Sequence, residues 1–207
     1  MRAKKLILFD WGNIVESHLT GYNCRDAWDI LFKKCGYTGD KRIFGSLREY
    51  KLSALKNEEE YKKAYEGIKK EFNLKVDFET YKKYYYESFD KIEYYKEVRD
   101  YEISLKERCY VGILSNLSIF DEKRIDRQLN LKEYDYVFLS FKIGYRKPSI
   151  ELFEYVSSSV PFKKEDILFI DDTIYNVNAA KEFGWKTLHA SGLELDKIKK
   201  ACEEFLN

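Results

Sequence analysis

Residues 6–13 read Leu-Ile-Leu-Phe-Asp-Trp-Gly-Asn, an apolar run that ends in a single carboxylate, Asp10, followed by a Gly-Asn turn. A continuous apolar run of this kind predicts a strand that is buried on both faces of a parallel sheet. In such sheets ligands bind just beyond the carboxyl ends of the strands. We therefore expect Asp10 to lie at the rim of a parallel sheet, where a ligand would bind.

Similar apolar runs recur along the chain, and the segments between the later runs have helical spacing. Val177, Ala180 and Phe183 share one helical face that ends at Gly184, and Pro148, a residue favoured in the first turn of a helix, precedes another apolar face. This alternation predicts an α/β fold with a parallel sheet of five or more strands. The predicted strands are residues 6–9, 110–114, 136–139, 167–170 and 186–189.

Residues 17–95 differ from the rest of the chain because they contain almost no strand pattern. Apolar and aromatic side chains recur there at helical spacing, over residues 28–35, 61–72 and 78–89. The segment is too long for an ordinary connection between two strands. We predict a core of residues 1–16 and 96–207 and an inserted helical bundle of residues 17–95. The bundle either only packs on the sheet or acts as a lid over the strand ends, and we favour the lid because both insertion points lie near Asp10.

Composition argues against several classes of function. Lys and Arg number 37 against 36 Asp and Glu, and the charges are mixed along the chain, which does not favour a nucleic-acid-binding protein. No apolar stretch approaches the roughly 20 residues of a membrane helix, and the run behind the basic start is too short for a signal peptide. The four cysteines form no CxxC pair, and with two histidines they offer no zinc spacing. We expect a cytoplasmic protein with reduced thiols that binds neither membrane nor nucleic acid.

Polar side chains follow several predicted strands or precede a predicted helix, and in a parallel sheet they would meet at one rim. Asp171 and Asp172 are adjacent there, and they would repel each other unless a cation lies between them. The polar residues at the rim are Asp10, Ser115, Asn116, Lys147, Asp171, Asp172 and Thr173.

This inventory matches what phosphoryl transfer requires, namely a nucleophile, a divalent cation, a hydroxyl donor and a fixed ammonium. Asp10 can attack phosphorus as a carboxylate. Mg²⁺ prefers one or two protein carboxylates, which Asp10 and Asp172 could supply. Ser115 and Lys147 would contact phosphate oxygens through a hydroxyl and a point charge. Further amide donors are Asn13 and Asn116.

Four motifs, in order along nearly the whole chain, resemble those of the haloacid dehalogenase-like hydrolase superfamily, in the branch with a helical cap inserted after the first strand. The motifs are Phe9-Asp10-Trp11-Gly12-Asn13-Ile14, Ile113-Leu114-Ser115-Asn116, Ile143-Gly144-Tyr145-Arg146-Lys147-Pro148 and Phe169-Ile170-Asp171-Asp172-Thr173. The resemblance implies a Rossmann-like sheet with helices on both faces and a mobile cap that sets substrate choice.

The same resemblance implies roles for individual residues. Asp10 would be the nucleophile, and Ser115 and Lys147 would bind phosphate beside Gly12, Asn13 and Asn116. Mg²⁺ would be held by Asp10, the Gly12 backbone carbonyl and Asp172, with Asp171 mainly behind these ligands. The substrate would be a small phosphorylated molecule.

The chain departs from the family pattern at Gly12. Most phosphatases of this family have a second Asp at that place, which protonates the leaving oxygen and then activates water. Positioned acid–base help is typically worth about a hundredfold or more. Glu16 and His18, just past the turn, are the nearest titratable substitutes, although a surface Glu and a lone His need no function.

Three functions follow as alternatives, ranked in this order. The first is a Mg²⁺-dependent phosphatase for a small metabolite with a good leaving group, since the Asp-x-Gly-Asn motif is similar to that of sugar-1-phosphate phosphatases. The second is a 2-haloacid dehalogenase that uses Asp10 without metal, against which the retained Asp171-Asp172 pair argues. The third is a catalytically weak protein that binds phosphorylated ligands or a partner.

Overall fold

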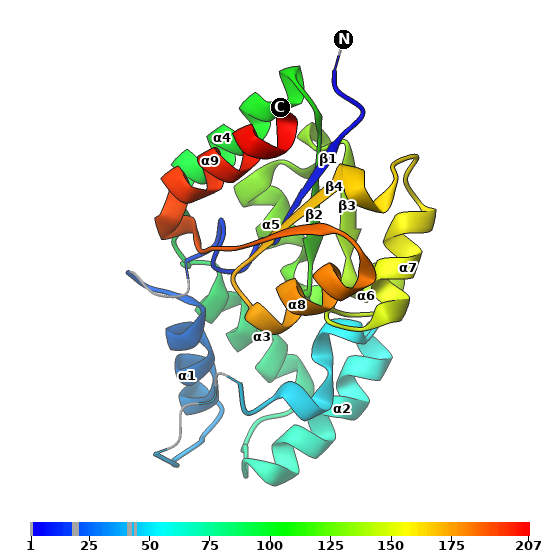
Figure 1. Ribbon diagram of the computed structural model, residues 1–207. Helices are drawn as coiled ribbons and strands as arrows, with labels where there is room; N and C mark the ends of the chain where they lie inside the picture. Colours follow the sequence, from blue (N-terminus) through cyan, green and yellow to red (C-terminus); the bar gives the residue numbers. More distant parts are fainter. Residues whose placement is uncertain (1, 18–20, 41–42, 44) are drawn as a thin grey trace.

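A five-stranded parallel sheet forms the centre of the computed structural model, which describes residues 2–17, 21–40, 43 and 45–207. The strand order is β3-β2-β1-β4-β5, and every neighbouring pair is parallel (Figure 1). The predicted strands are confirmed, and two of them extend one residue further, to Ser115 and Asp171. The strands are β1 (Leu6–Phe9), β2 (Tyr110–Ser115), β3 (Tyr136–Leu139), β4 (Ile167–Asp171) and β5 (Lys186–His189).

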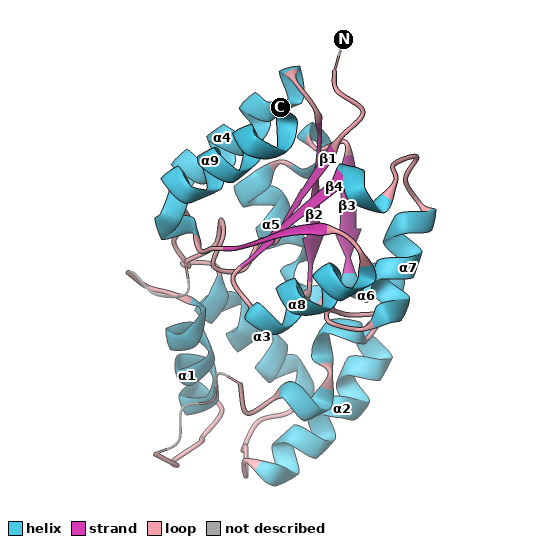
Figure 2. Ribbon diagram, in the orientation of Figure 1, coloured by secondary structure: helices cyan, strands magenta, loops and turns pink. Residues whose placement is uncertain are grey.

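Helices cover both faces of the sheet, as predicted (Figure 2). Alternate residues of a strand point to opposite faces, so Ile7 and Phe9 belong to one buried cluster and Leu6 and Leu8 to the other. The first cluster includes side chains of α4 (Lys96–Ser104), α5 (Glu122–Leu129) and α9 (Leu195–Leu206). The second includes side chains of α7 (Ile150–Ser158) and α8 (Ile174–Phe183). The short helix α6 (Ser140–Ile143) follows β3.

The two helix ends that were read from the sequence have different outcomes. Helix α8 ends as predicted, because Gly184 has a φ of 109° and its N–H caps the last turn. Pro148 does not lie in the first turn of α7. That helix begins at Ile150, with Ser149 as its N-cap, so Pro148 stands two residues before it.

Three longer helices lie together at the end of the sheet where the strands terminate (Figure 1). They are α1 (Cys24–Lys34), α2 (Glu58–Glu71) and α3 (Phe78–Phe89), with short 3₁₀ helices η1 (Arg48–Tyr50) and η2 (Leu52–Ala54) between α1 and α2. Their facing side chains form a separate buried cluster that is largely aromatic, and four tyrosines are at its centre. These fully buried tyrosines are Tyr61, Tyr65, Tyr81 and Tyr85.

The chain passes between the sheet and these helices twice, and the two passages are bonded to each other. The N–H of Ser17 donates to the carbonyl of Glu93, and the N–H of Tyr95 donates to that of Val15. The division into a core of residues 1–16 and 96–207 and a helical cap of residues 17–95 remains a prediction. The two bonds lie at its boundaries.

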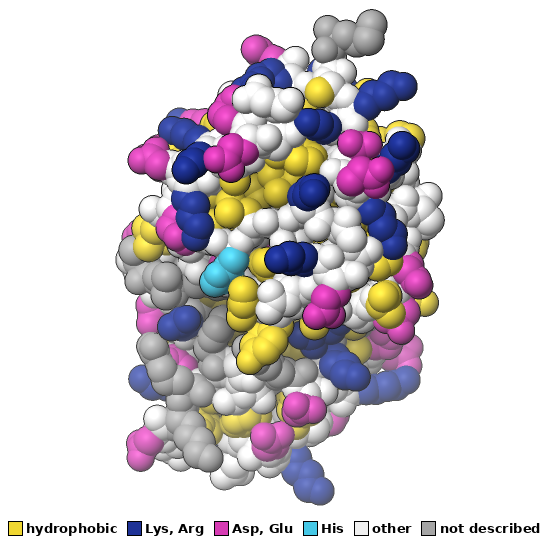
Figure 3. Space-filling model, viewed as in Figure 1, with side chains coloured by type: hydrophobic (Ala, Val, Ile, Leu, Met, Phe, Trp, Pro, Cys, Tyr) yellow, Lys and Arg dark blue, Asp and Glu magenta, His cyan; other side chains and the backbone are white. Residues whose placement is uncertain are grey.

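The surface in Figure 3 carries Lys and Arg side chains dispersed among Asp and Glu. Within the described part of the chain, no helix has both the length and the apolar character needed to cross a membrane.

Candidate functional site

One of the two carboxylate oxygens of Asp10, which follows β1, is held by several neighbouring groups. The Asp10 N–H donates to the Ile170 carbonyl at 2.9 Å, which keeps the residue beside β4. Asp10 Oδ1 accepts from the Trp11 N–H and from the Ser115 hydroxyl, both at 2.7 Å. Lys147 Nζ lies 2.9 Å from the same oxygen. Since no hydrogen bond from the described residues reaches Oδ2, that oxygen is the one available to a ligand.

Lys147 is buried at the centre of the site. Its ammonium contacts one oxygen for each of its N–H groups: the Leu114 carbonyl at 2.9 Å, Asp10 Oδ1 at 2.9 Å and Asp171 Oδ2 at 2.6 Å. Burial lowers the pKa of Lys147, but the carboxylates of Asp10 and Asp171 outweigh burial and raise it above its ordinary value. The lysine is therefore a permanent cation that holds the two carboxylates side by side.

Asn116 holds the backbone of Lys147 in place. Its Oδ1 accepts from the Lys147 N–H at 2.9 Å, and its Nδ2 donates to the Lys147 carbonyl at 3.0 Å. The sequence predicts that Asn116 is an amide donor to a phosphate, whereas in the structure both its amide oxygen and its amide nitrogen are bonded to Lys147. Its observed contribution is to position the lysine.

Three carboxylates converge at the rim and could hold a cation. Asp10, Asp171 and Asp172 each offer an oxygen within 4.8 Å of the others. The oxygens of Asp171 are fully committed, because they accept from Lys147 Nζ, the Thr173 N–H and the Asn176 amide. Asp10 and Asp172 are thus better placed than Asp171 to contact an ion directly.

A backbone turn brings Asn13 to the same carboxylates. Asn13 has a φ of 56°, a left-handed conformation that Asn tolerates better than most residues. Its Nδ2 donates to Asp172 Oδ2 at 2.9 Å, while its buried Oδ1 has no hydrogen-bond partner among the described residues. An unpartnered buried oxygen beside three carboxylates fits a hard cation such as Mg²⁺, which prefers oxygen ligands.

Gly192 packs against this turn from the C-terminal part of the chain. Its N–H donates to the Asn13 carbonyl at 2.8 Å, and a Cβ at this position would lie 2.2 Å from the Ile14 carbonyl oxygen. Only glycine permits this approach, so the turn that follows Asp10 is supported from outside the sheet.

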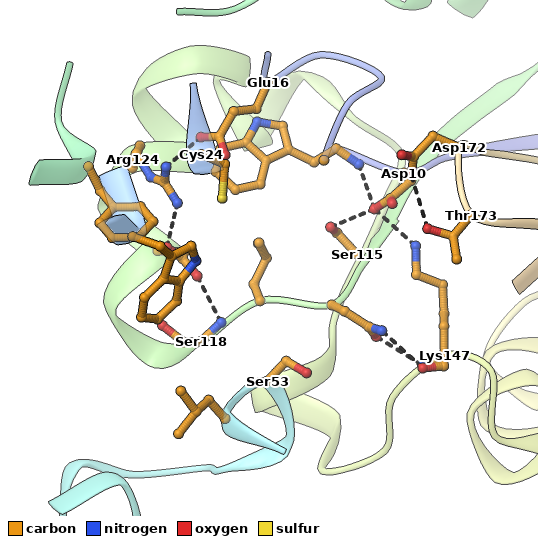
Figure 4. Close-up of a pocket in the computed structure, with 18 of the residues that line it drawn as sticks. Asp10, Glu16, Cys24, Ser53, Ser115, Ser118, Arg124, Lys147, Asp172 and Thr173 are labelled. Carbon is orange, nitrogen blue, oxygen red and sulfur yellow. Dashed lines mark hydrogen bonds and ion pairs between the residues drawn. The ribbon is translucent and has the colours of Figure 1, made fainter. Parts of the chain in front are cut away.

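A cavity of about 420 Å³ opens over the rim (Figure 4). Its wall includes Asp10, Asn116, Lys147 and Asp172 together with side chains from α1, η2 and α3. Gly12, Ser115 and Thr173 also line it, so the structure brings the polar residues expected at the rim to one place, with Asp171 and Asn13 behind its surface. Ser140 after β3 donates a hydrogen bond to the Ser53 carbonyl in η2, which ties the helices to the rim.

The prediction that Glu16 is a surface residue is wrong. The residue is 1% exposed, and its Oε2 lies 2.6 Å from Arg124 NH1 on α5. His18 lies outside the residues that the structure describes. His189, at the end of β5, is exposed, and its Nε2 lies 2.8 Å from the backbone carbonyl oxygen of Asp172.

Several residues of the cavity wall were not found from the sequence. Arg124 and Asp121 belong to a stretch rich in charged residues that resembles an exposed helix, and Tyr85 belongs to the tyrosine-rich α3. In the structure, Asp121 Oδ1 accepts from Arg124 NH2 at 2.5 Å and from the Tyr85 hydroxyl at 2.6 Å. The one available signal was Ser118-x-x-Asp121, a capping pattern that places Asp121 at a helix start.

Comparisons with known proteins identify the family of the chain. Residues 26–190 match the family model described as haloacid dehalogenase-like hydrolase. D-ribitol-5-phosphate phosphatase of Bacteroides thetaiotaomicron is 27% identical over 198 residues, which cover 88% of this chain and 90% of that protein.

Two solved structures share the fold. One is a HAD family enzyme of Bacteroides thetaiotaomicron, an aspartate-to-alanine variant with magnesium and inorganic phosphate. It has a TM-score of 0.72 and 21% identity, over 93% of this chain and 96% of that one. The other is a HAD-like family hydrolase of Porphyromonas gingivalis, with a TM-score of 0.71 and 23% identity over 96% of this chain and 98% of that one.

Proposed function

The chain belongs to the haloacid dehalogenase-like hydrolase family, and from that premise we propose that it is a Mg²⁺-dependent phosphatase that forms a covalent aspartyl-phosphate on Asp10. The observation that carries the proposal is the asymmetry of the Asp10 carboxylate. Oδ1 is held by Trp11, Ser115 and Lys147, whereas Oδ2 has no bond from the described residues. A carboxylate fixed by one oxygen and free at the other is oriented for attack.

The residues at the rim fit a magnesium ion. Asp10, Asp172 and the Gly12 backbone carbonyl would hold it, with the orphaned Asn13 oxygen close by. When bound, Mg²⁺ would offset the negative charge of the phosphate and of the carboxylates. The solved relative with magnesium and inorganic phosphate supports this assignment through its shared fold.

The protein residues would carry out two displacements. Asp10 Oδ2 forms a bond to phosphorus while the bond from phosphorus to the leaving oxygen breaks. Water then attacks phosphorus, which releases inorganic phosphate and restores the carboxylate. The Ser115 hydroxyl and the Lys147 ammonium hold Asp10 for the attack, and the positive charge of Lys147 stabilises charge on the phosphate oxygens.

Gly12 has no side chain with which to protonate the leaving oxygen. A substrate whose leaving group is itself stable as an anion, such as an anomeric or acyl phosphate, needs that help least. The relative that acts on D-ribitol 5-phosphate supports a small phosphorylated carbohydrate or polyol as the substrate class. Residues 17–95 would act as the cap that encloses it.

An assay with p-nitrophenyl phosphate tests the proposal. We expect hydrolysis that requires Mg²⁺, stops with a chelator and is lost in Asp10→Asn. Asp90→Asn is a matched control, because Asp90 is exposed and pairs with Arg127 away from the cavity. Hydrolysis that persists in Asp10→Asn would contradict the covalent role, and chloride release from a 2-chloro acid without metal would favour dehalogenation.

A further inference from the structure

A group of buried charged side chains lies at the end of the cavity away from Asp10. We name Glu16, Asp121 and Arg124 the far-end cluster. Figure 4 shows Arg124 and Glu16 on one side of the pocket and Asp10, Ser115 and Lys147 on the other. The three side chains of the cluster are 2%, 8% and 5% exposed, respectively. None of them contributes to the proposed chemistry at Asp10.

Arg124 is held rigidly at the centre of the cluster. Its guanidinium lies 4.8 Å from the centre of the Trp11 ring and 4.9 Å from that of Phe89. NH1 donates to Glu16 and NH2 donates to Asp121, while Nε has no partner among the described residues. A guanidinium has more N–H groups than these two bonds use, so Arg124 has donors to spare in a wall of the cavity.

The polar groups around the cluster suit hydroxyl groups. The Ser118 hydroxyl accepts from the Phe120 N–H and lies 3.4 Å from the Tyr85 hydroxyl, which itself donates to Asp121. Trp11 and Trp28 contribute aromatic wall to the same cavity, which suits the C–H faces of a carbon chain. A hydroxylated tail could therefore donate to the carboxylates, accept from Arg124 and pack on the rings.

Among the described residues, the charged side chains at this end balance one another without a ligand. Glu16 and Asp121 are anions and Arg124 is a cation, and Arg25 on α1 adds a second cation to the cavity wall. These four charges sum to zero. A tail that ends in a carboxylate or a second phosphate would bring an uncompensated charge into a buried site, which is costly.

We propose that the far-end cluster determines specificity by selecting phosphorylated substrates whose other end is uncharged and hydroxylated over those whose other end is anionic. The inference rests on the proposed function, because it assumes that the phosphate binds at Asp10. It assigns the buried ion pairs that Arg124 of α5 makes with Glu16 and Asp121 a task beyond stability, namely to exclude anionic tails.

Two ligands of matched size test the charge of the tail. Glycerol 3-phosphate and 3-phosphoglycerate differ in having a hydroxymethyl group or a carboxylate at the far end. Their dissociation constants are measured by calorimetry with Mg²⁺ in the Asp10→Asn variant, which does not consume them. We expect glycerol 3-phosphate to bind about tenfold more tightly than 3-phosphoglycerate, and more tightly than inorganic phosphate.

Substitutions in the cluster should shift that ratio. Asp121→Asn and, independently, Glu16→Gln each remove one negative charge with little change of shape. Each is expected to move the preference about tenfold toward 3-phosphoglycerate. Asp90→Asn removes the same charge from the exposed surface and should leave the ratio unchanged. If one cluster variant does not fold, the other provides the same comparison.

The outcomes separate this inference from the proposed function. Suppose that the wild-type protein hydrolyses p-nitrophenyl phosphate, but the two ligands bind equally or neither cluster variant shifts the ratio of their dissociation constants. The far-end cluster then does not discriminate between neutral and anionic tails. If neither ligand binds, the inference is overturned as well. If the ratio shifts as expected but the wild-type protein hydrolyses no phosphate ester, the specificity role of the far-end cluster is supported and the phosphatase proposal is wrong.

Discussion

Glu102, a fully buried carboxyl on α4, should make the protein less stable as the pH rises. Its Oε2 accepts from the Tyr134 hydroxyl at 2.6 Å, and Oε1 has no partner among the described residues. Burial raises the pKa of Glu102 to about 8, against an ordinary value of 4.5, although Tyr134 and Arg99 oppose the rise. The folded state therefore keeps a proton that the unfolded state has lost.

The sign and size of the effect follow from linkage. Below pH 4.5 the carboxyl is protonated in both states and has no influence. Between about pH 4.5 and 8 the folded state binds more protons, so the free energy of unfolding falls as pH rises, and above pH 8 the loss is complete. One pKa unit corresponds to about 1.4 kcal/mol. The ionisation of Glu102 alone therefore lowers the free energy of unfolding by about 3 kcal/mol between pH 5 and pH 8.

Glu102→Gln removes the titration and keeps an acceptor for Tyr134. Urea unfolding of both proteins at pH 5 and pH 8 measures the difference, which should grow by about 3 kcal/mol in favour of the variant as pH rises. Glu97→Gln, an exposed glutamate on the same helix, serves as the control. If the difference between wild type and Glu102→Gln is the same at both pH values, Glu102 is ionised in the folded protein and the reasoning is refuted.

Three further substitutions probe the site and the fold. Lys147→Met leaves two buried carboxylates without a cation. The value of kcat/KM for p-nitrophenyl phosphate at saturating Mg²⁺ should therefore fall by about a hundredfold or more. A smaller fall would mean that the lysine serves folding alone. Gly192→Ala places a Cβ against the Ile14 carbonyl and should cost about 1–3 kcal/mol in urea unfolding, and an unchanged midpoint would mean that the turn can yield. Asp77→Ala removes the N-cap bond to the Thr80 N–H at 2.8 Å and should lower the midpoint of thermal unfolding, and Asp77→Asn should restore most of that loss.

Local patterns in the sequence were sufficient to predict the five strands and several of the helices. The apolar runs at residues 6–9 and 167–170 became neighbouring strands, because a continuous apolar segment is stable only when both its faces are covered. The tyrosines of residues 61–89 recur at helical spacing, and the structure buries four of them in one cluster. Helix ends were harder to predict, as Pro148 shows, because the first residue of a helix depends on contacts with the rest of the protein.

By itself the sequence determined the α/β class, the parallel sheet and the meeting of Asp10, Ser115 and Asp171 at one rim, since parallel strands end on the same side. Only the tertiary structure decided that Glu16 is buried against Arg124, 108 positions away, and that Lys147 is shared between two carboxylates. The physical reason is that a charged residue looks exposed in any local pattern. Whether it is buried depends on a partner of opposite charge, and folding alone brings that partner into contact.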